Sequence, residues 1–117
     1  MKVLIVEIDL PVANLLVSML EKNFPGSTCV KVRDGDTALE QLTYPGDGNK
    51  FDLAIIDAET RIDEGIHLIR QIRENGIQIP VILVDPIRAM GDIGKVVILA
   101  KPFGAEVLSN AVRMVKR

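Results

Sequence analysis

The sequence is poor in the residues on which several common kinds of site depend. It holds one cysteine, Cys29, and one histidine, His67. An intramolecular disulfide and a structural zinc site are therefore both excluded, since the zinc site needs about four Cys or His ligands. The histidine has no GxSxG serine to activate, and Gly94-Lys95 lacks the other residues of a phosphate-binding loop. These absences argue against a disulfide-stabilised secreted domain, a serine hydrolase and a nucleotide-binding enzyme.

The chain also lacks a basic excess and a long apolar segment. Its 14 Lys and Arg residues face 16 Asp and Glu residues, giving a formal charge of −2. Nucleic-acid binding needs a basic excess to release counterions. The apolar N-terminus is interrupted by Glu7 and Asp9, so it is too short for a signal peptide or a membrane span. We therefore expect a cytoplasmic protein that binds neither nucleic acid nor membrane.

The apolar residues that are present follow two alternating patterns. Short runs rich in β-branched residues are typical of strands in a parallel sheet, and they cover residues 3–6, 28–32, 53–56, 81–84 and 96–99. Helical spacing occurs between them and after them, over residues 12–20, 38–42, 66–72 and 108–115. The alternation predicts one domain, residues 1–117, with a doubly wound α/β fold. We expect a five-stranded parallel sheet of order 2-1-3-4-5, with the first and last helices on one face.

One connection is too short for the usual crossover. Residues 85–95 join the fourth strand to the fifth, and a parallel crossover with its helix needs at least about 10–12 residues. This segment also contains Pro86, Gly91 and Gly94. We therefore expect the fourth helix of the fold to be shortened or missing.

Charged residues follow the predicted strands. Glu7 and Asp9 follow the first strand, Asp57 the third, Asp85 the fourth and Lys101 the fifth. Open α/β sheets place their sites at this carboxyl edge. Carboxylates that converge there repel one another unless a cation lies among them, and Mg²⁺ prefers such oxygen ligands. The alternative for Asp9 is that it caps the following helix.

Three segments in this order resemble the receiver domain of response regulators, the CheY-like family. They are VLIVEID at residues 3–9, FDLAIID at residues 51–57 and KPF at residues 101–103. Asp34-Gly35 before the second helix and Gly65 after the third strand fit the same pattern. The resemblance spans the chain and implies the flavodoxin-like fold of that family.

In that family the aspartate of the third strand accepts a phosphoryl group from a histidine kinase. The resemblance therefore implies that Asp57 is the phosphoacceptor and that Lys101 pairs with the phosphoryl oxygens. It also implies a Mg²⁺ site formed by Glu7, Asp9, Asp57 and the backbone carbonyl of Glu59. The partner would be a histidine kinase or another signalling protein.

The sequence departs from the family at several of these positions. Ile8 stands where the direct metal ligand is expected, Asp85 replaces the hydroxyl residue of the fourth strand, and Ile98 replaces the aromatic switch residue. Arg61 replaces a proline. We expect Asp85 to pair permanently with Lys101, because both end neighbouring strands.

These departures predict a degenerate receiver, not an enzyme, that acts as a protein–protein interaction switch with weak or no phosphorylation. Mg²⁺ binding should be weak, and a homodimer could form through the last strand and the C-terminal helix. The first alternative is a conventional receiver, phosphorylated on Asp57 with Mg²⁺ held by Glu7 and Asp9. The second is a small α/β hydrolase using the same acidic edge, which the short chain disfavours because it leaves no room for a lid.

Overall fold

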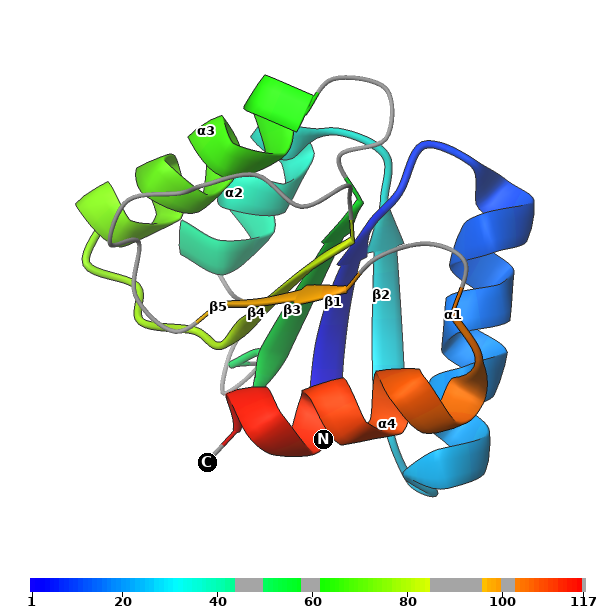
Figure 1. Cartoon of the computed structure of the whole chain (residues 1–117). Coiled ribbons are helices and arrows are strands. Elements are labelled where there is room, and N and C mark those ends of the chain that lie inside the picture. The colour runs from blue at the N-terminus through cyan, green and yellow to red at the C-terminus, as the bar shows by residue number, and fades with distance from the viewer. Residues whose placement is uncertain (44–49, 58–61, 85–95, 100–102, 117) are drawn as a thin grey trace.

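A computed structural model describes residues 1–43, 50–57, 62–84, 96–99 and 103–116 of the chain, without the side chains of residues 62–64. Strands and helices alternate along this part of the sequence (Figure 1). In chain order the elements are β1 (Lys2–Val6), α1 (Leu10–Asn23), β2 (Thr28–Val32), α2 (Gly35–Thr43), β3 (Leu53–Asp57), α3 (Ile62–Glu74), β4 (Val81–Val84), β5 (Val96–Leu99) and α4 (Ala105–Val115).

The five strands form one parallel sheet of order β2-β1-β3-β4-β5. The predicted strands and their predicted order are confirmed. β2, in which polar and apolar residues are mixed, lies at one edge of the sheet, and β3, apolar up to its last residue Asp57, lies at the centre. The helix expected to be shortened or missing falls in residues 85–95, which lie outside the described residues.

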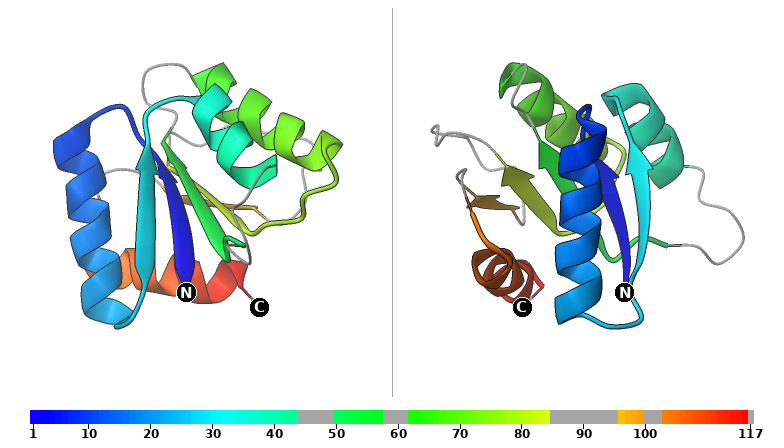
Figure 2. Two further views of the ribbon diagram at one scale, coloured as in Figure 1. Left: turned by 180° about the vertical axis from the view of Figure 1, so that it is seen from behind. Right: turned by 90° about the vertical axis from the view of Figure 1, so that its right-hand side faces the viewer.

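Alternate residues of each strand feed two separate hydrophobic cores. Val3 and Ile5 of β1 pack with the buried faces of α1 and α4, whereas Leu4 and Val6 pack with α2 and α3. Because both faces are covered, the residues of β1, β3 and β4 that the helices bury are apolar on both faces of the sheet. Figure 2 shows the resulting three layers, with α1 and α4 on one side of the sheet and α2 and α3 on the other.

Local signals explain where α1 begins and where α3 ends. Asp9 caps α1, since its Oδ1 accepts a hydrogen bond from the Val12 N–H at 3.3 Å, and Pro11 lies in the first turn, where no N–H is needed. α3 ends before Gly76, whose φ of +76° is the left-handed conformation that favours glycine after a helix. Asp9 therefore has the capping role that was one of its two predicted interpretations.

One helical pattern differs in detail from the sequence expectation. The predicted apolar stripe of the first helix includes Leu15, yet this side chain is 54% exposed. The buried positions of α1 are Ala13, Leu16 and Leu20. The stripe that faces the sheet therefore lies along Ala13 and Leu20 and leaves Leu15 in solvent, and α1 is still placed where the pattern predicts. In the part of the chain that the structure describes, no helix is long and apolar enough to cross a membrane.

Candidate functional site

Three charged residues lie at the carboxyl ends of three neighbouring strands. Val6 of β1 pairs with Val32 of β2 and with Ile56 of β3. The next residues along these strands are Arg33, Glu7 and Asp57. They therefore form one row across the sheet edge, and Glu7 lies between the other two. The Glu7 N–H donates to the Val32 carbonyl oxygen at 3.0 Å, which extends the pairing of β1 and β2 to this row.

The three side chains differ in burial. Glu7 is 4% exposed, Asp57 is half-buried and Arg33 is exposed. A carboxylate buried as deeply as Glu7 is poorly screened by water, so it interacts strongly with nearby charges. Convergence of Glu7 and Asp57 at one edge, which the sequence predicts, is therefore present in the fold.

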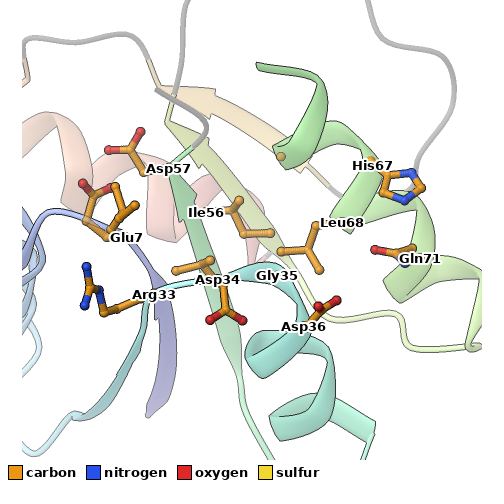
Figure 3. A pocket seen from close by; sticks show the side chains of 13 residues that line it. Glu7, Arg33, Asp34, Gly35, Asp36, Ile56, Asp57, His67, Leu68 and Gln71 are labelled. Atoms are coloured by element: carbon orange, nitrogen blue, oxygen red, sulfur yellow. The ribbon is translucent and has the colours of Figure 1, made fainter. Parts of the chain in front are cut away.

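A cavity of about 380 Å³ opens at this edge, between the ends of β1, β2 and β3 and the helices α2 and α3. Four carboxylates line it, those of Glu7, Asp34, Asp36 and Asp57. Arg33 lines it as well, together with apolar side chains of the sheet and α3 (Figure 3). The predicted phosphoacceptor, Asp57, therefore shares this cavity with three other carboxylates.

The wall formed by α2 is fixed by a helix cap. The Oδ1 of Asp34 accepts a hydrogen bond from the Thr37 N–H at 2.7 Å. The hydrogen bonds from Thr37, and to a smaller extent the positive charge of Arg33, hold the pKa of Asp34 below its usual value. At Gly35 α2 lies against α3, where an added Cβ atom would meet the Leu68 Cδ1 at 3.6 Å, an ordinary van der Waals contact.

The other wall is formed by α3. His67 is exposed, Gln71 is half-buried, and both line the cavity opposite the sheet edge. Figure 3 shows the two side chains on the α3 side and Glu7, Arg33 and Asp57 on the other. Sequence analysis gave neither α3 residue a role in the site.

The residues beside Glu7 limit what the site can bind. Ile8 lines the cavity, is 53% exposed and offers no oxygen ligand. Asp9 has its carboxylate on the N-terminus of α1, and its N–H donates to Glu7 Oε1 at 3.2 Å. Among the described residues, no group of three or more His, Cys, Asp or Glu side chains is placed to hold a metal ion.

Magnesium usually keeps several waters and binds through one or two protein carboxylates plus phosphate oxygens. Glu7 and Asp57 supply two such carboxylates at the cavity. The side chain at position 8 adds none, and Asp9 is engaged at the helix cap. This donor set fits a Mg²⁺ ion that keeps several of its waters, with one carboxylate fewer than an Asp at position 8 would supply.

The remaining predicted site residues are not placed. Asp85, Lys101 and Arg61, and the Glu59 carbonyl named as a metal ligand, lie outside the described residues. Ile98, at the position of the aromatic switch, is half-buried on β5.

Arg33 and Asp36 are charged residues of the cavity to which sequence analysis gave no role, and Arg33 is the cation among them. The signal that singled out Glu7 and Asp57, a charge directly after a strand, applies to it equally.

Both the sequence and the structure of the chain are similar to known proteins. The model of the family described as response regulator receiver domain matches residues 3–113. The receiver domain of a Francisella response regulator is similar in structure, with a TM-score of 0.77 at 25% identity, over 98% of this chain and 95% of that one. A signal receiver domain of a histidine kinase from Syntrophus aciditrophicus has a TM-score of 0.75 at 25% identity, covering 98% and 89%.

A chemotaxis response regulator of Vibrio cholerae, CheY4, shares the fold at lower identity. Its TM-score is 0.75 at 20% identity, over 97% of both chains. No curated protein sequence matches this chain.

Proposed function

The chain belongs to the family of response regulator receiver domains, which act in two-component signalling, and we propose that it is an atypical receiver that accepts a phosphoryl group poorly. The observation that carries this proposal is the exposed Ile8 at an edge where Glu7 and Asp57 converge. The acceptor is retained there, while the carboxylate set around it is reduced.

Asp57 is the phosphoacceptor of this proposal. A carboxylate oxygen of Asp57 forms a bond to the phosphorus of a phosphohistidine or an acyl phosphate. The bond from phosphorus to the leaving group breaks at the same time, and the imidazole or acylate departs with the bonding electron pair. Asp57 is half-buried and lines the cavity by which such a donor would approach, although one of its carboxylate oxygens, Oδ2, is buried.

Charge explains why this transfer is slow. An incoming phosphoryl donor is an anion, and the cavity it enters is lined by four carboxylates. Negative charges that lie close together repel one another unless cations lie between them. Glu7 and Asp57 would supply the carboxylate ligands of a Mg²⁺ ion, which would neutralise phosphoryl charge in this chemistry. Because Ile8 adds no ligand, that compensation is available only at high Mg²⁺ concentration.

The predicted pairing of Asp85 with Lys101 adds to this effect. A lysine already paired with a carboxylate is a poorer partner for phosphoryl oxygens, and the domain would then be held in one state. The chain acts through contact with a histidine kinase or another signalling protein, as one domain over residues 1–117, in the cytoplasm. It has no enzymatic activity of its own and does not bind nucleic acid.

A second copy of the chain is a candidate partner at the C-terminal helix. Val107 and Met114 of α4 are 49% and 56% exposed. They lie about two turns apart and so share one side of the helix. This exposed side of α4, together with β5, is the face on which a homodimer would form.

The test is acyl phosphate labelling followed by intact-mass measurement. With Mg²⁺ present, we expect a minority of molecules to gain one phosphoryl mass, and the Asp57→Asn variant to gain none. The control is Asp52→Asn, since Asp52 follows the half-buried Phe51 at the opposite edge of the sheet and binds the Lys2 N–H at 2.7 Å. Stoichiometric labelling of the wild type would show a conventional receiver, and equal labelling of Asp57→Asn would place the acceptor elsewhere.

A further inference from the structure

Arg33 occupies a position that neither the family resemblance nor the proposed function uses. It directly follows β2, the strand next to β1, and its predecessor Val32 accepts the N–H of Glu7 at 3.0 Å. Neighbouring strands lie about 4.8 Å apart, so Arg33 and Glu7 leave the sheet side by side. Figure 3 shows the Arg33 guanidinium on the same side of the cavity as Glu7 and Asp57.

The charge balance of the cavity gives this arginine its importance. Among the described residues that line the cavity, Arg33 is the one side chain with a permanent positive charge, against four carboxylates. Asp34 directs its carboxylate to the N-terminus of α2 through the hydrogen bond from Thr37. Glu7 is the deeply buried member of the four, so its charge is the one that a nearby cation stabilises most.

We propose that Arg33 is the counter-cation of this acidic edge. Its positive charge compensates the negative charges of Glu7 and Asp57, a role that Mg²⁺ would have if the edge carried more carboxylates. A guanidinium remains protonated at all physiological pH values, and its planar donors match the oxygens of a carboxylate or a phosphoryl group. The exposed position leaves the side chain free to turn toward either. Arg33 therefore weakens Mg²⁺ binding and makes Asp57 less dependent on the ion.

The first consequence can be measured without any phosphoryl transfer. A single positive charge about 6 Å from a divalent cation, in a surrounding with the dielectric constant of water, weakens binding about tenfold. Arg33→Gln should therefore bind Mg²⁺ about tenfold more tightly than the wild type at low ionic strength. The gain should shrink as salt is added, because salt screens exposed charges.

Two further variants separate this effect from loss of structure or of net charge. Arg33→Lys keeps the charge and should bind Mg²⁺ within about twofold of the wild type, since a lysine is a comparable point charge. Lys22→Gln removes one positive charge from an exposed position in the last turn of α1, away from the cavity, and should leave Mg²⁺ binding unchanged. Titration is followed by amide NMR shifts of residues around Glu7. Equal Mg²⁺ affinity of wild type and Arg33→Gln would overturn the proposal.

The second consequence rests on the proposed function. With EDTA present, acyl phosphate should still label a trace of the wild type and of Arg33→Lys, but not Arg33→Gln. Restoring Mg²⁺ should bring Arg33→Gln up to at least the wild-type level. Labelling of Arg33→Gln without Mg²⁺ at the wild-type rate would count against Arg33. If no variant is labelled even with Mg²⁺, the acceptor role of Asp57 fails, and the Mg²⁺ titration alone decides the role of Arg33.

Discussion

Replacing Ile8 by Asp tests directly whether this position limits Mg²⁺ binding. Ile8 is 53% exposed, so the substitution gives up roughly half of the 1.5–3 kcal/mol that full burial of such a side chain provides, or about 1 kcal/mol. The new carboxylate also lies beside those of Glu7 and Asp57, and their repulsion lowers stability further. Without Mg²⁺, we expect Ile8→Asp to be at least about 1 kcal/mol less stable than the wild type.

Magnesium should then stabilise Ile8→Asp more than it stabilises the wild type. A ligand that binds only the folded state adds RT ln(1 + [L]/Kd), which is about 0.4 kcal/mol at 10 mM Mg²⁺ for a Kd of about 10 mM. If the third carboxylate tightens the site to about 0.1 mM, the gain is about 2.7 kcal/mol. The assay is urea denaturation with and without MgCl₂, at matched ionic strength. Ile8→Asn, polar but uncharged, serves as the matched control.

Two results would refute this reasoning. A wild type that gains more than about 1 kcal/mol from 10 mM Mg²⁺ would mean that the existing donor set is already sufficient. An Ile8→Asp variant that gains no more than Ile8→Asn would mean that the side chain at position 8 does not reach the ion.

The other predictions concern the edges of the site. Asp85→Thr should lower stability by about 1–3 kcal/mol, because Lys101 is left uncompensated, and should raise acyl phosphate labelling; if urea denaturation and mass measurement show neither, the predicted pair does not exist. Since the folded-state pKa of Asp34 is lowered, its stabilising effect is present above about pH 4 and is lost as the pH falls below it. Asp34→Ala should therefore be less stable than the wild type at neutral pH and should converge with it on acidification, and parallel stability profiles would contradict this. Gly35→Ala meets only an ordinary contact at 3.6 Å and should change stability by less than about 1 kcal/mol, whereas Gly76→Ala, at φ +76°, should cost about 1 kcal/mol or more by thermal unfolding.

The sheet could be predicted from the sequence because each strand is an apolar run with a clear beginning and end. Residues 53–56, for example, are buried on both faces and admit few other interpretations. The exact buried side of α1 could not be predicted. Its apolar residues cover more than one side of the helix, and the small Ala13 proved to be buried where the larger Leu15 is exposed. Which side of α1 is buried depends on how the helix packs against the sheet, and the local sequence pattern does not reveal that packing.

The site was predictable to the extent that it depends on strand ends. Glu7 and Asp57 converge because parallel strands bring their carboxyl ends to one edge. The two roles open to Asp9 could not be separated by sequence, since one side chain can cap a helix or bind a metal. The contribution of α3, through His67 and Gln71, depends on how that helix lies over the sheet. Helix placement is a tertiary property, and the spacing of residues along α3 alone does not reveal it.

The most direct test of the central claim, a retained acceptor in a weakened site, uses beryllium fluoride as a mimic of the phosphoryl group. Amide NMR spectra of the wild type are recorded with Mg²⁺ during titration with beryllium fluoride. Reduced charge compensation around Asp57 predicts small, unsaturated shifts confined to the ends of β1 and β3, and larger saturable shifts in Ile8→Asp. A complete and saturable change across the wild-type spectrum, lost in Asp57→Asn, would contradict the claim and show a conventional receiver.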